Sequence, residues 1–320
     1  MVIPSPKSEA LTVGSRGDAG PDRVGPVQPQ AARRRMSLRT YSYLFYLPAG
    51  LVYGVIFIIP TAISFYFAFT RWDLFTATWT GLDNFRQFFA EQSLRTSLRN
   101  TLIYAVVTSG LKVVLGMLFA VALTSGIRTR GILRSLVFFP VLVSTVAVGI
   151  TFSVLLNPDT GLVNTALSWV GISGPDWLGS STTALLSVAL VDVWKGVGLA
   201  TVIYIAGILS ISREYYEAVD VDGGGAWTKF RNITLPLARP ATFTVILLSF
   251  IGGLRSFDLI WTMTGGGPGF SSDTIASVIY KQYQAGFYGL ATAGNVVLFI
   301  LVSIIVFPMS RYFNSREVDQ

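Results

Sequence analysis

The 320-residue chain contains neither cysteine nor histidine. Without cysteine it has no disulfide, no thiolate nucleophile and no cysteine metal ligand. Without histidine it lacks the most common general acid and base of enzymes. The sequence also has no G-x-x-x-x-G-K-[ST] motif, which excludes ATP hydrolysis at a Walker A loop of this chain. These absences argue against covalent catalysis and against a metal centre.

Charged residues are scarce as well. They form 13% of the chain, whereas soluble domains carry about 25%. Hydrophobic residues account for 52%, and the mean hydropathy is +0.57. This composition predicts an all-α, polytopic membrane protein. Apolar segments close to the roughly 20 residues that cross a bilayer mark six spans, at about 42–70, 101–125, 132–156, 182–211, 241–263 and 288–310.

The distribution of basic residues predicts the orientation of these spans. With the N-terminus inside, thirteen Lys or Arg residues flank the cytoplasmic ends and only five lie outside, as the positive-inside rule requires. The net charge of +7 is therefore attributed to loop topology and not to nucleic-acid binding. We expect a disordered cytoplasmic tail over 1–40, a transmembrane domain over 41–312 and a cytoplasmic tail over 313–320, with both termini inside.

Five charged residues fall within the predicted spans: Lys112, Asp192, Lys195, Arg255 and Asp258. A charge at the bilayer centre costs about 2.5–3.5 kcal/mol on insertion scales, so such side chains face the bundle interior or a water-filled path. The spacing places Asp192 and Lys195 on one helix face and repeats in Arg255 and Asp258. These pairs indicate either internal ion pairs or a substrate pathway near mid-membrane. Lys112, which stands alone, is expected to snorkel or to pack.

Aromatic residues accompany these charges. Trp194, Tyr204, Phe257 and Trp261 lie beside them in the sequence. Aromatic faces next to polar groups suit sugar rings, whose C–H faces are apolar and whose hydroxyls need hydrogen bonds. Ordinary helix packing or an interfacial aromatic belt explains each single residue equally simply.

The segment 213–240, between the fourth and fifth spans, predicts a helix, a glycine turn and a second helix. Residues 213–221 are helix formers, the glycines at 223–225 permit a sharp turn, and Phe230 and Ile233 follow Ala226 at helical spacing. Pro236 and Pro240 are expected to end the second helix. A short amphipathic helix on the cytoplasmic face needs either a partner groove or the lipid interface for its apolar side.

This segment resembles the EAA loop of the membrane subunits of binding-protein-dependent ABC importers, which follows the pattern E-A-A-x-x-D-G-A-x5-F-x-x-I-x-L-P-x3-P. Nine of the eleven fixed positions match, while Val219 and Gly224 replace two alanines. In that family the loop is a coupling helix that docks into a cleft of the ATPase subunit. The resemblance therefore implies an ATPase contact through Glu217, Ala218, Asp222, Gly223, Phe230, Ile233, Leu235 and Pro236.

A second set of motifs resembles the carbohydrate branch of these permeases. It comprises the segment 256–268 with its Gly-Gly-Gly-Pro turn, Tyr280, the segment 287–289, and the segments 81–85 and 100–101 before the second span. The resemblance covers about residues 40–312 and is closest to the first, maltose-type permease of a heterodimer.

Aligned through these motifs, the family's sugar-contacting positions fall on Asp192, Lys195, Gly196, Leu199, Ser249, Gly253 and Ser256. The in-span charges Arg255 and Asp258 join this expected substrate site. Leu199 and Gly253 carry no polar group, which argues against maltose itself but not against a sugar.

The resemblance also implies the surroundings of the chain. Its expected partners are a second permease, an ATP-binding subunit dimer, an extracytoplasmic solute-binding protein, a sugar and membrane lipid, and no nucleic acid. The chain itself is expected to bind no cofactor and no metal, because ATP and Mg²⁺ would belong to the ATPase. The expected location is a bacterial or archaeal cytoplasmic membrane, and the loop 157–181 and the turn 265–268 are expected to contact the solute-binding protein.

Three alternatives remain at this point. Asp192 and Asp258 are compatible with an ion-coupled secondary transporter, although no inverted repeat of broken helices accompanies them. Lys195 and Arg255 are compatible with an anionic substrate such as glycerol 3-phosphate. A membrane scaffold without a pathway would need the same charges only for assembly.

Overall fold

The computed structural model describes residues 43–126 and 128–317. The chain divides into two compact units, Met1–Gly50 and Leu51–Gln320. In the first unit the described part is the 3₁₀ turn η1 (Tyr43–Tyr46) and the beginning of α1 (Leu47–Tyr53). The tail predicted over 1–40 lies outside the described residues.

The described residues contain four helices long and apolar enough to cross a membrane, or up to six if each of two bent pairs forms one span. This confirms a polytopic helical membrane protein. The four are the helix Leu47–Phe67, α4 (Gln92–Thr124), α8 (Ala184–Leu209) and the segment Tyr288–Phe313 of α15 (Tyr288–Glu317). The bent pairs are α5 (Arg130–Leu142) with α6 (Thr145–Leu155), at 98°, and the segment Ala226–Leu237 with α12 (Arg239–Leu254), at 66°.

Two predicted spans are interrupted. A single helix over 132–156 is wrong, because Val143 and Ser144 are extended between α5 and α6. Pro140, near the end of α5, cannot donate a helical hydrogen bond, and the helix ends two residues later. A single helix over 241–263 is also wrong: α12 ends at Leu254, and α13 covers Asp258–Met263.

Two other prolines are accommodated by widening the helix. The π-helical turn η2 (Gly54–Ile58) precedes α2 (Ile59–Phe67), which contains Pro60. The π-helical turn η3 (Phe230–Thr234) precedes α11 (Leu235–Leu237), which contains Pro236. A proline ring clashes with the carbonyl four residues earlier in an α-helix, and a wider turn before the ring relieves this clash. Pro236 therefore does not end the helix, contrary to expectation, and the 66° bend comes at Ala238.

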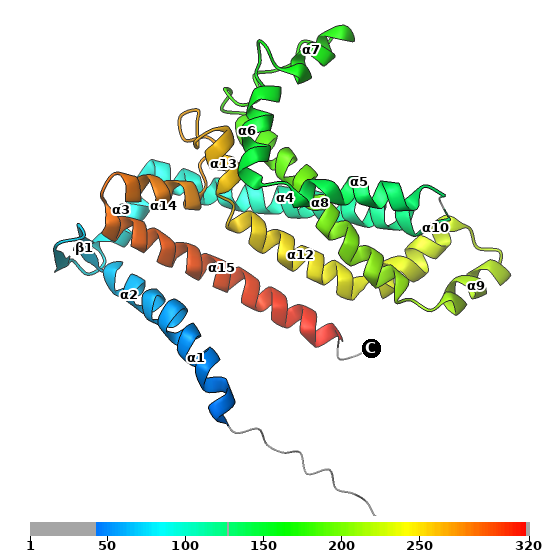
Figure 1. Ribbon diagram of the computed structural model, residues 1–320, viewed down its shortest axis with the longest axis horizontal. Helices are drawn as coiled ribbons and strands as arrows, with labels where there is room; N and C mark the ends of the chain where they lie inside the picture. Colours follow the sequence, from blue (N-terminus) through cyan, green and yellow to red (C-terminus); the bar gives the residue numbers. More distant parts are fainter. Residues whose placement is uncertain (1–42, 127, 318–320) are drawn as a thin grey trace, which may run out of the picture. The chain divides into compact units, whose positions relative to one another are not determined.

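Helix α4 is the centre of the packing and contacts α8 and α12 along its length (Figure 1). Small residues permit this close approach, as is common between membrane helices. A Cβ built on Gly116 of α4 would lie 2.8 Å from Ala200 Cβ, and one on Gly253 of α12 would lie 2.6 Å from Ala105 Cα. Substituting either glycine would push two helices apart.

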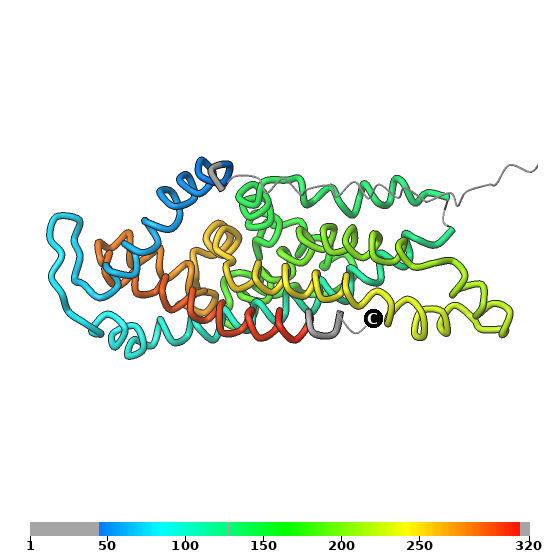
Figure 2. Tube along the Cα trace, turned by 90° about the horizontal axis from the view of Figure 1, so that it is seen from below, coloured from blue at the N-terminus to red at the C-terminus, as the bar shows by residue number. Residues whose placement is uncertain are grey.

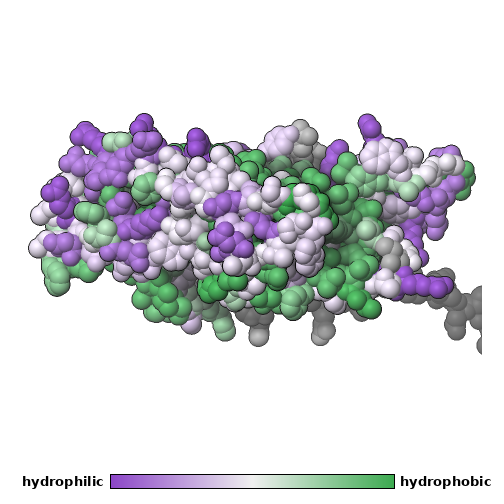
Figure 3. Space-filling model, turned by 90° about the horizontal axis from the view of Figure 1, so that it is seen from above, coloured by the Kyte–Doolittle hydropathy of each residue, from purple (hydrophilic) through white to green (hydrophobic). Residues whose placement is uncertain are grey.

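The short elements gather at the two ends of the bundle. The antiparallel hairpin of β1 (Thr70–Trp72) and β2 (Ala77–Trp79), α3 (Asp83–Ala90) and α14 (Ile275–Gln284) lie at one end. Helices α9 (Arg213–Val221) and α10 (Ala226–Lys229) lie at the other, as Figures 1 and 2 agree. Helix α7 (Leu162–Trp169) follows α6. Figure 3 shows broad hydrophobic areas beside hydrophilic ones on the face that it presents.

Candidate functional site

An ion pair joins α4 to α8 within the membrane-spanning part of the chain. Lys112 Nζ lies 2.9 Å from Asp192 Oδ2, and the two side chains are only 9% and 19% exposed. Gly196, one turn after Asp192, makes room for this contact, because a Cβ built there would lie 2.7 Å from Lys112 Cε. The lysine chain thus lies flat along α8 and delivers its ammonium group to the carboxylate.

This contact bears on two interpretations of the sequence. Of the alternatives left open for Asp192 and Lys195, an ion pair between them is not formed: Asp192 pairs with Lys112, because the register of α4 against α8 decides the partner. The expectation that Lys112 merely snorkels or packs is wrong for the same reason. Lys195 is half-buried and has no ion-pair partner among the described residues.

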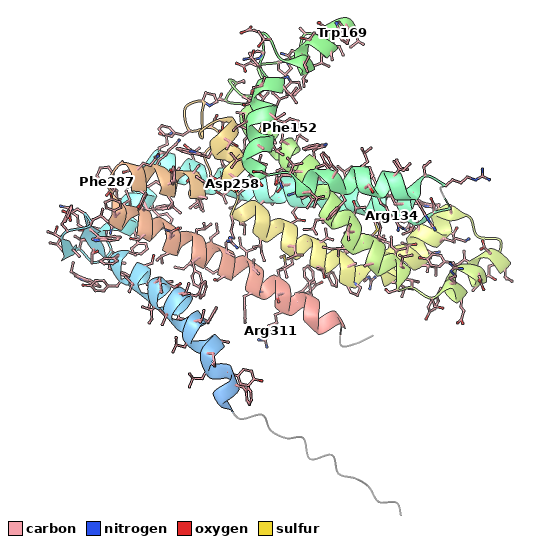
Figure 4. All side chains as sticks on the ribbon, viewed as in Figure 1. Arg134, Phe152, Trp169, Asp258, Phe287 and Arg311 are labelled. Carbon is pink, nitrogen blue, oxygen red and sulfur yellow. The ribbon has the colours of Figure 1, made fainter. Side chains whose placement is uncertain are left out.

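An ion pair of Arg255 with Asp258, one of the two alternatives that the spacing left open, is absent from the ion pairs of the described residues. The two residues do not share a helix face, because they flank the break between α12 and α13. Both side chains are exposed, and Figure 4 places Asp258 at the junction of the two helices. Non-helical backbone and exposed charges at membrane depth occur where they are enclosed by protein or line a watery cavity.

A side chain from outside the span stabilises this break. The Thr274 hydroxyl donates a hydrogen bond of 3.0 Å to the Ser256 carbonyl, which is freed from helical bonding. Thr274 itself caps α14 through a capping box with Ser277. The predicted substrate residue Ser256 is therefore held by the residue that begins α14, at the end of the bundle that carries the β1–β2 hairpin.

The remaining predicted substrate residues are spread over this region. Gly253 is buried against α4, with Thr108 Oγ1 2.9 Å from a Cβ built on the glycine, whereas Ser249 is half-buried and Leu199 is exposed. The structure brings Asp192 and Gly196 together around Lys112. It leaves Leu199 and Ser249 outside that cluster, and the Ser249 hydroxyl has no hydrogen bond among the described residues.

One polar residue at this site was missed. The Tyr104 hydroxyl is fully buried beside the Asp192 carboxylate and the Ser256 side chain, yet it has no hydrogen-bond partner of acceptable geometry among the described residues. Tyr104, Thr108 and Lys112 recur at intervals of four on α4. This polar stripe in an apolar helix was a signal that the sequence offered.

The segment 213–240 forms the predicted helix, glycine turn and second helix, although Pro236 does not end the second helix. Helix α9 is followed by a turn in which Gly223 has φ +76°, and α10 begins at Ala226. The Lys229–Asp220 ion pair, with an N–O distance of 2.6 Å, closes the turn. The Tyr216 hydroxyl shares a hydrogen bond of 3.1 Å with the Thr234 hydroxyl. These contacts join the two helices of the loop into one unit.

Val219 and Gly224, the two residues that replace alanines of the loop motif, lie against each other. A Cβ built on Gly224 would lie 2.4 Å from Val219 Cγ1 and 3.1 Å from the Val219 carbonyl oxygen. A valine at 219 therefore requires a glycine at 224. The two substitutions relative to the family pattern compensate each other sterically.

The most exposed large apolar side chains of this loop are not those singled out from the sequence, of which only Leu235, at 44%, is both large and exposed. Val221 is 88% and Trp227 68% exposed. Phe230 is half-buried and packs against the chain's own core cluster, which includes Met117 and Tyr204. The exposed apolar tip, defined as Val221 and Trp227, was missed because helical spacing alone does not say which face the bundle covers.

At the opposite end of the bundle, two motifs that are far apart in the sequence contact each other. The Asn100 amide donates hydrogen bonds to the carbonyls of Ser271 (2.8 Å) and Asp273 (3.1 Å), and the Ile275 N–H donates to Thr101 Oγ1 (2.9 Å). The buried Asp273 carboxylate pairs with Lys281 at 2.7 Å. Asn100 and Thr101 thus fix the loop that follows the Gly-Gly-Gly-Pro turn.

This turn and the loop after α6 line one pocket of about 480 Å³, which includes Asn157, Asp176, Thr264 and Pro268. Trp169, at the end of α7, is 81% exposed and points away from the bundle in Figure 4. The two segments expected to contact a solute-binding protein therefore lie next to each other.

Residues 112–318 match the family model described as the inner membrane component of binding-protein-dependent transport systems. The chain belongs to this family. It is a permease subunit and not an enzyme. The matched region contains the loop 213–240 and every predicted substrate residue.

The similarity to named relatives extends over most of the chain. This chain is 32% identical over 275 residues to the trehalose/maltose transport system permease protein MalF of Thermococcus litoralis, and the alignment covers 84% of this chain and 93% of that protein. It is 30% identical over 314 residues to the arabinooligosaccharides transport system permease protein AraP of Bacillus subtilis, covering 92% and 99%.

A solved structure agrees with the fold. The permease matches a chain of a bacterial ABC transporter involved in the import of the acidic polysaccharide alginate, with a TM-score of 0.76 and 25% identity, covering 85% of this chain and 94% of that chain. It also matches a chain of a bacterial alginate ABC transporter solved in complex with an alginate pentasaccharide-bound periplasmic protein, with a TM-score of 0.73 and 25% identity.

Proposed function

We propose that this permease forms half of the pathway by which an ATP-driven importer moves a sugar or oligosaccharide across a bacterial or archaeal cytoplasmic membrane. The observation that carries the proposal is the polar cluster of Tyr104, Lys112 and Asp192 facing the α12–α13 break, inside a bundle whose relatives are named as sugar permeases. In this proposal the protein crosses the membrane six times, each bent pair counting as one span, with both termini in the cytoplasm.

The exposed charges at the break support a second permease as partner. Arg255 and Asp258 are exposed on this chain alone, and a charge facing lipid at that depth is costly. A second subunit would enclose them in a shared, watery path. Substrate would bind there between Asp192, Lys195, Gly196 and the break, with Leu199, Ser249 and Gly253 around it.

The loop 213–240 supports coupling to a pair of ATPase subunits, which would bind ATP and Mg²⁺. Its exposed apolar tip, Val221 and Trp227, suits a cleft on another protein. Glu217, Ala218 and Asp222 surround this tip, Gly223 forms the turn, and Phe230, Ile233, Leu235 and Pro236 join it to the bundle. Closure of the ATPases would move the loop and alternate the access of the central site.

At the outer face, the adjacency of the loop 157–181 and the turn 265–268 supports docking of a sugar-loaded binding protein. Binding protein, sugar and ATP would each favour a different state of one two-state bundle, which is what allows them to be coupled.

The test is purification of the tagged chain from native membranes, followed by sugar uptake in proteoliposomes. We expect a second permease, a Walker-motif ATPase and a binding protein to co-elute, and uptake to require ATP. Uptake that follows a proton or sodium gradient and ignores ATP would refute the proposal. It would favour a secondary transporter.

An anionic sugar is the second candidate substrate. Lys195 and Arg255 have no carboxylate partner among the described residues and are free to bind a carboxylate or phosphate group. The variant Arg255→Gln should then reduce uptake of a uronate oligosaccharide much more than uptake of a neutral one. Equal reductions would assign Arg255 to assembly.

A further inference from the structure

A pocket of about 350 Å³ at the outer end of the permease lies outside the sites described above. It is formed by β1, α14, the beginning of α15 and the residue before α13. We call it the aromatic pocket, and its lining residues are Trp72, Phe257, Ala276, Ile279, Tyr280, Tyr283, Tyr288, Ala291, Thr292 and Asn295.

Two groups of contacting rings line this pocket. On one side Tyr288 touches both Trp72 and Tyr283, with ring centroids 5.6 and 5.1 Å apart. On the other side Phe257 and Tyr280 meet edge to face at 5.2 Å. Rings fixed by such contacts form preorganised apolar surfaces, onto which the C–H face of a sugar ring can stack at little entropic cost.

A polar residue among these rings argues against lipid as the occupant. Asn295 is exposed in the apolar helix α15, and its amide has no hydrogen-bond partner among the described residues. A bare amide facing hydrocarbon is unfavourable, because both its donors and its acceptor lose water. The pocket is therefore best filled by water or by a ligand that offers hydroxyl groups.

The aromatic pocket adjoins the expected pathway. Phe257 lines it, and the neighbouring residues are Ser256 and Asp258 of the α12–α13 break. A ligand stacked on Phe257 would lie next to the break. In this arrangement the pocket would be the outer neighbour of the central site.

We propose that the aromatic pocket is an outer subsite that holds one neutral glycosyl unit of an oligosaccharide on its way to the central site. This inference rests on the proposed sugar transport. The unit is neutral because the lining contains no charged residue. The volume is at the lower end of the roughly 300–1,000 Å³ range of ligand pockets, which suits a single ring unit and not a whole chain.

The absence of cysteine from the chain makes a direct test possible. The variant Ala276→Cys places one thiol in the aromatic pocket. Ala285→Cys places a matched thiol on the exposed end of the same helical segment, outside the lining. In the purified complex in nanodiscs, the rate of reaction with a water-soluble, charged methanethiosulfonate is measured with and without neutral malto-, arabino- and xylo-oligosaccharides.

We expect the thiol at 276 to react without sugar and to react at least fivefold more slowly with the oligosaccharide that the transporter takes up. The thiol at 285 should react equally in both conditions. Adding Tyr280→Leu or the more exposed Tyr283→Leu should raise the sugar concentration for half protection about tenfold. Phe243→Leu, which removes a ring stacked on Phe313 far from the pocket, should leave that concentration unchanged.

Three results would overturn the subsite. A thiol at 276 that does not react with the charged reagent would mean that lipid or a partner helix fills the pocket. A thiol that reacts but gains no protection from the sugar taken up would leave sugar transport intact and refute the subsite alone. If the wild-type complex takes up no sugar, the proposed function fails, and this inference fails with it.

Discussion

We expect removal of either Lys112 or Asp192 alone to cost much more unfolding free energy than removal of both charges together. Lys112→Met leaves the Asp192 carboxylate in a site where it is 19% exposed and has lost its partner at 2.9 Å. Removing one partner of a buried pair costs about 3–5 kcal/mol. An unpaired charge in mid-membrane costs about 2.5–3.5 kcal/mol on insertion scales. We therefore expect each single variant, Lys112→Met or Asp192→Asn, to lose about 3 kcal/mol of unfolding free energy.

The double variant Lys112→Met with Asp192→Asn removes both charges at once. It should lose about 1 kcal/mol or less, because replacing a whole buried pair by neutral groups is often close to neutral. The two single losses would then exceed the double loss by about 5 kcal/mol, an interaction energy far above the ~0.5 kcal/mol error of additivity.

Unfolding in mixed detergent micelles, titrated with SDS and followed by circular dichroism, measures these free energies. Lys195→Met is the matched control, since that lysine lies on the same helix without an ion-pair partner among the described residues, and it should change stability little. Additive losses in the double variant would refute the reasoning. A double variant that is stable but no longer transports would assign the pair to the pathway as well as to packing.

Three further predictions concern the loops. Gly224→Ala should destabilise the loop 213–240 by about 1–3 kcal/mol, because the new Cβ would clash with Val219. Adding Val219→Ala in the same chain should restore the stability of the loop, and limited proteolysis of the loop measures both effects. Gly266→Ala should lower the thermal stability of the permease severely, because residue 266 has φ +87° and the new Cβ would clash with the buried Asp273 carboxylate. Gly265→Ala is the matched control: residue 265 has φ +57° but lies in open space, so this variant should cost only about 1–2 kcal/mol. Hydrogen bonds from Thr76 hold the pKa of Asp73 below its ordinary value. The ionised carboxylate therefore stabilises the hairpin at neutral pH, and this stabilisation is lost as the pH falls below about 4. The indole fluorescence of Trp79 should then change on acidification in the wild type and much less in Asp73→Asn.

The helix–turn–helix of the loop 213–240 was predictable because its structure is determined locally. The helix formers of α9, the left-handed Gly223 and the start of α10 follow each other within fifteen residues, and each has its own sequence signal. Which side of the second helix is exposed was not predictable. That depends on contacts between Phe230 and the distant residues of the core.

The central site was only partly predictable, for the opposite reason. Composition and insertion cost identify Asp192 as buried, but its partner depends on the register of α4 against α8. Glycines set this register: Gly116 lets the backbones approach, and Gly196 makes room for the Lys112 chain. The break after Leu254 has no proline or glycine at residues 255–257, and the Thr274 hydroxyl that accommodates it comes from another part of the chain.

Helix α12 connects the features discussed above. Its sixteen residues span about 24 Å, from the 66° bend at the cytoplasmic loop to the break that carries Arg255. A rod with a bend at each end turns as a unit, so a displacement of the loop at its first residue must displace the other end too. We expect the pivot to be the close contact of Gly253 with Ala105 of α4, next to the break. Because this contact lies near the end of α12, a large movement of the loop would become a small movement at the break. A small movement there would suffice to open or close the contacts of about 3 Å that Asp192 makes with Lys112 and Ser256 makes with Thr274. Gly253→Ala should therefore weaken the coupling of uptake to ATP hydrolysis more than it weakens ATPase activity itself, and equal losses of both would place the pivot elsewhere.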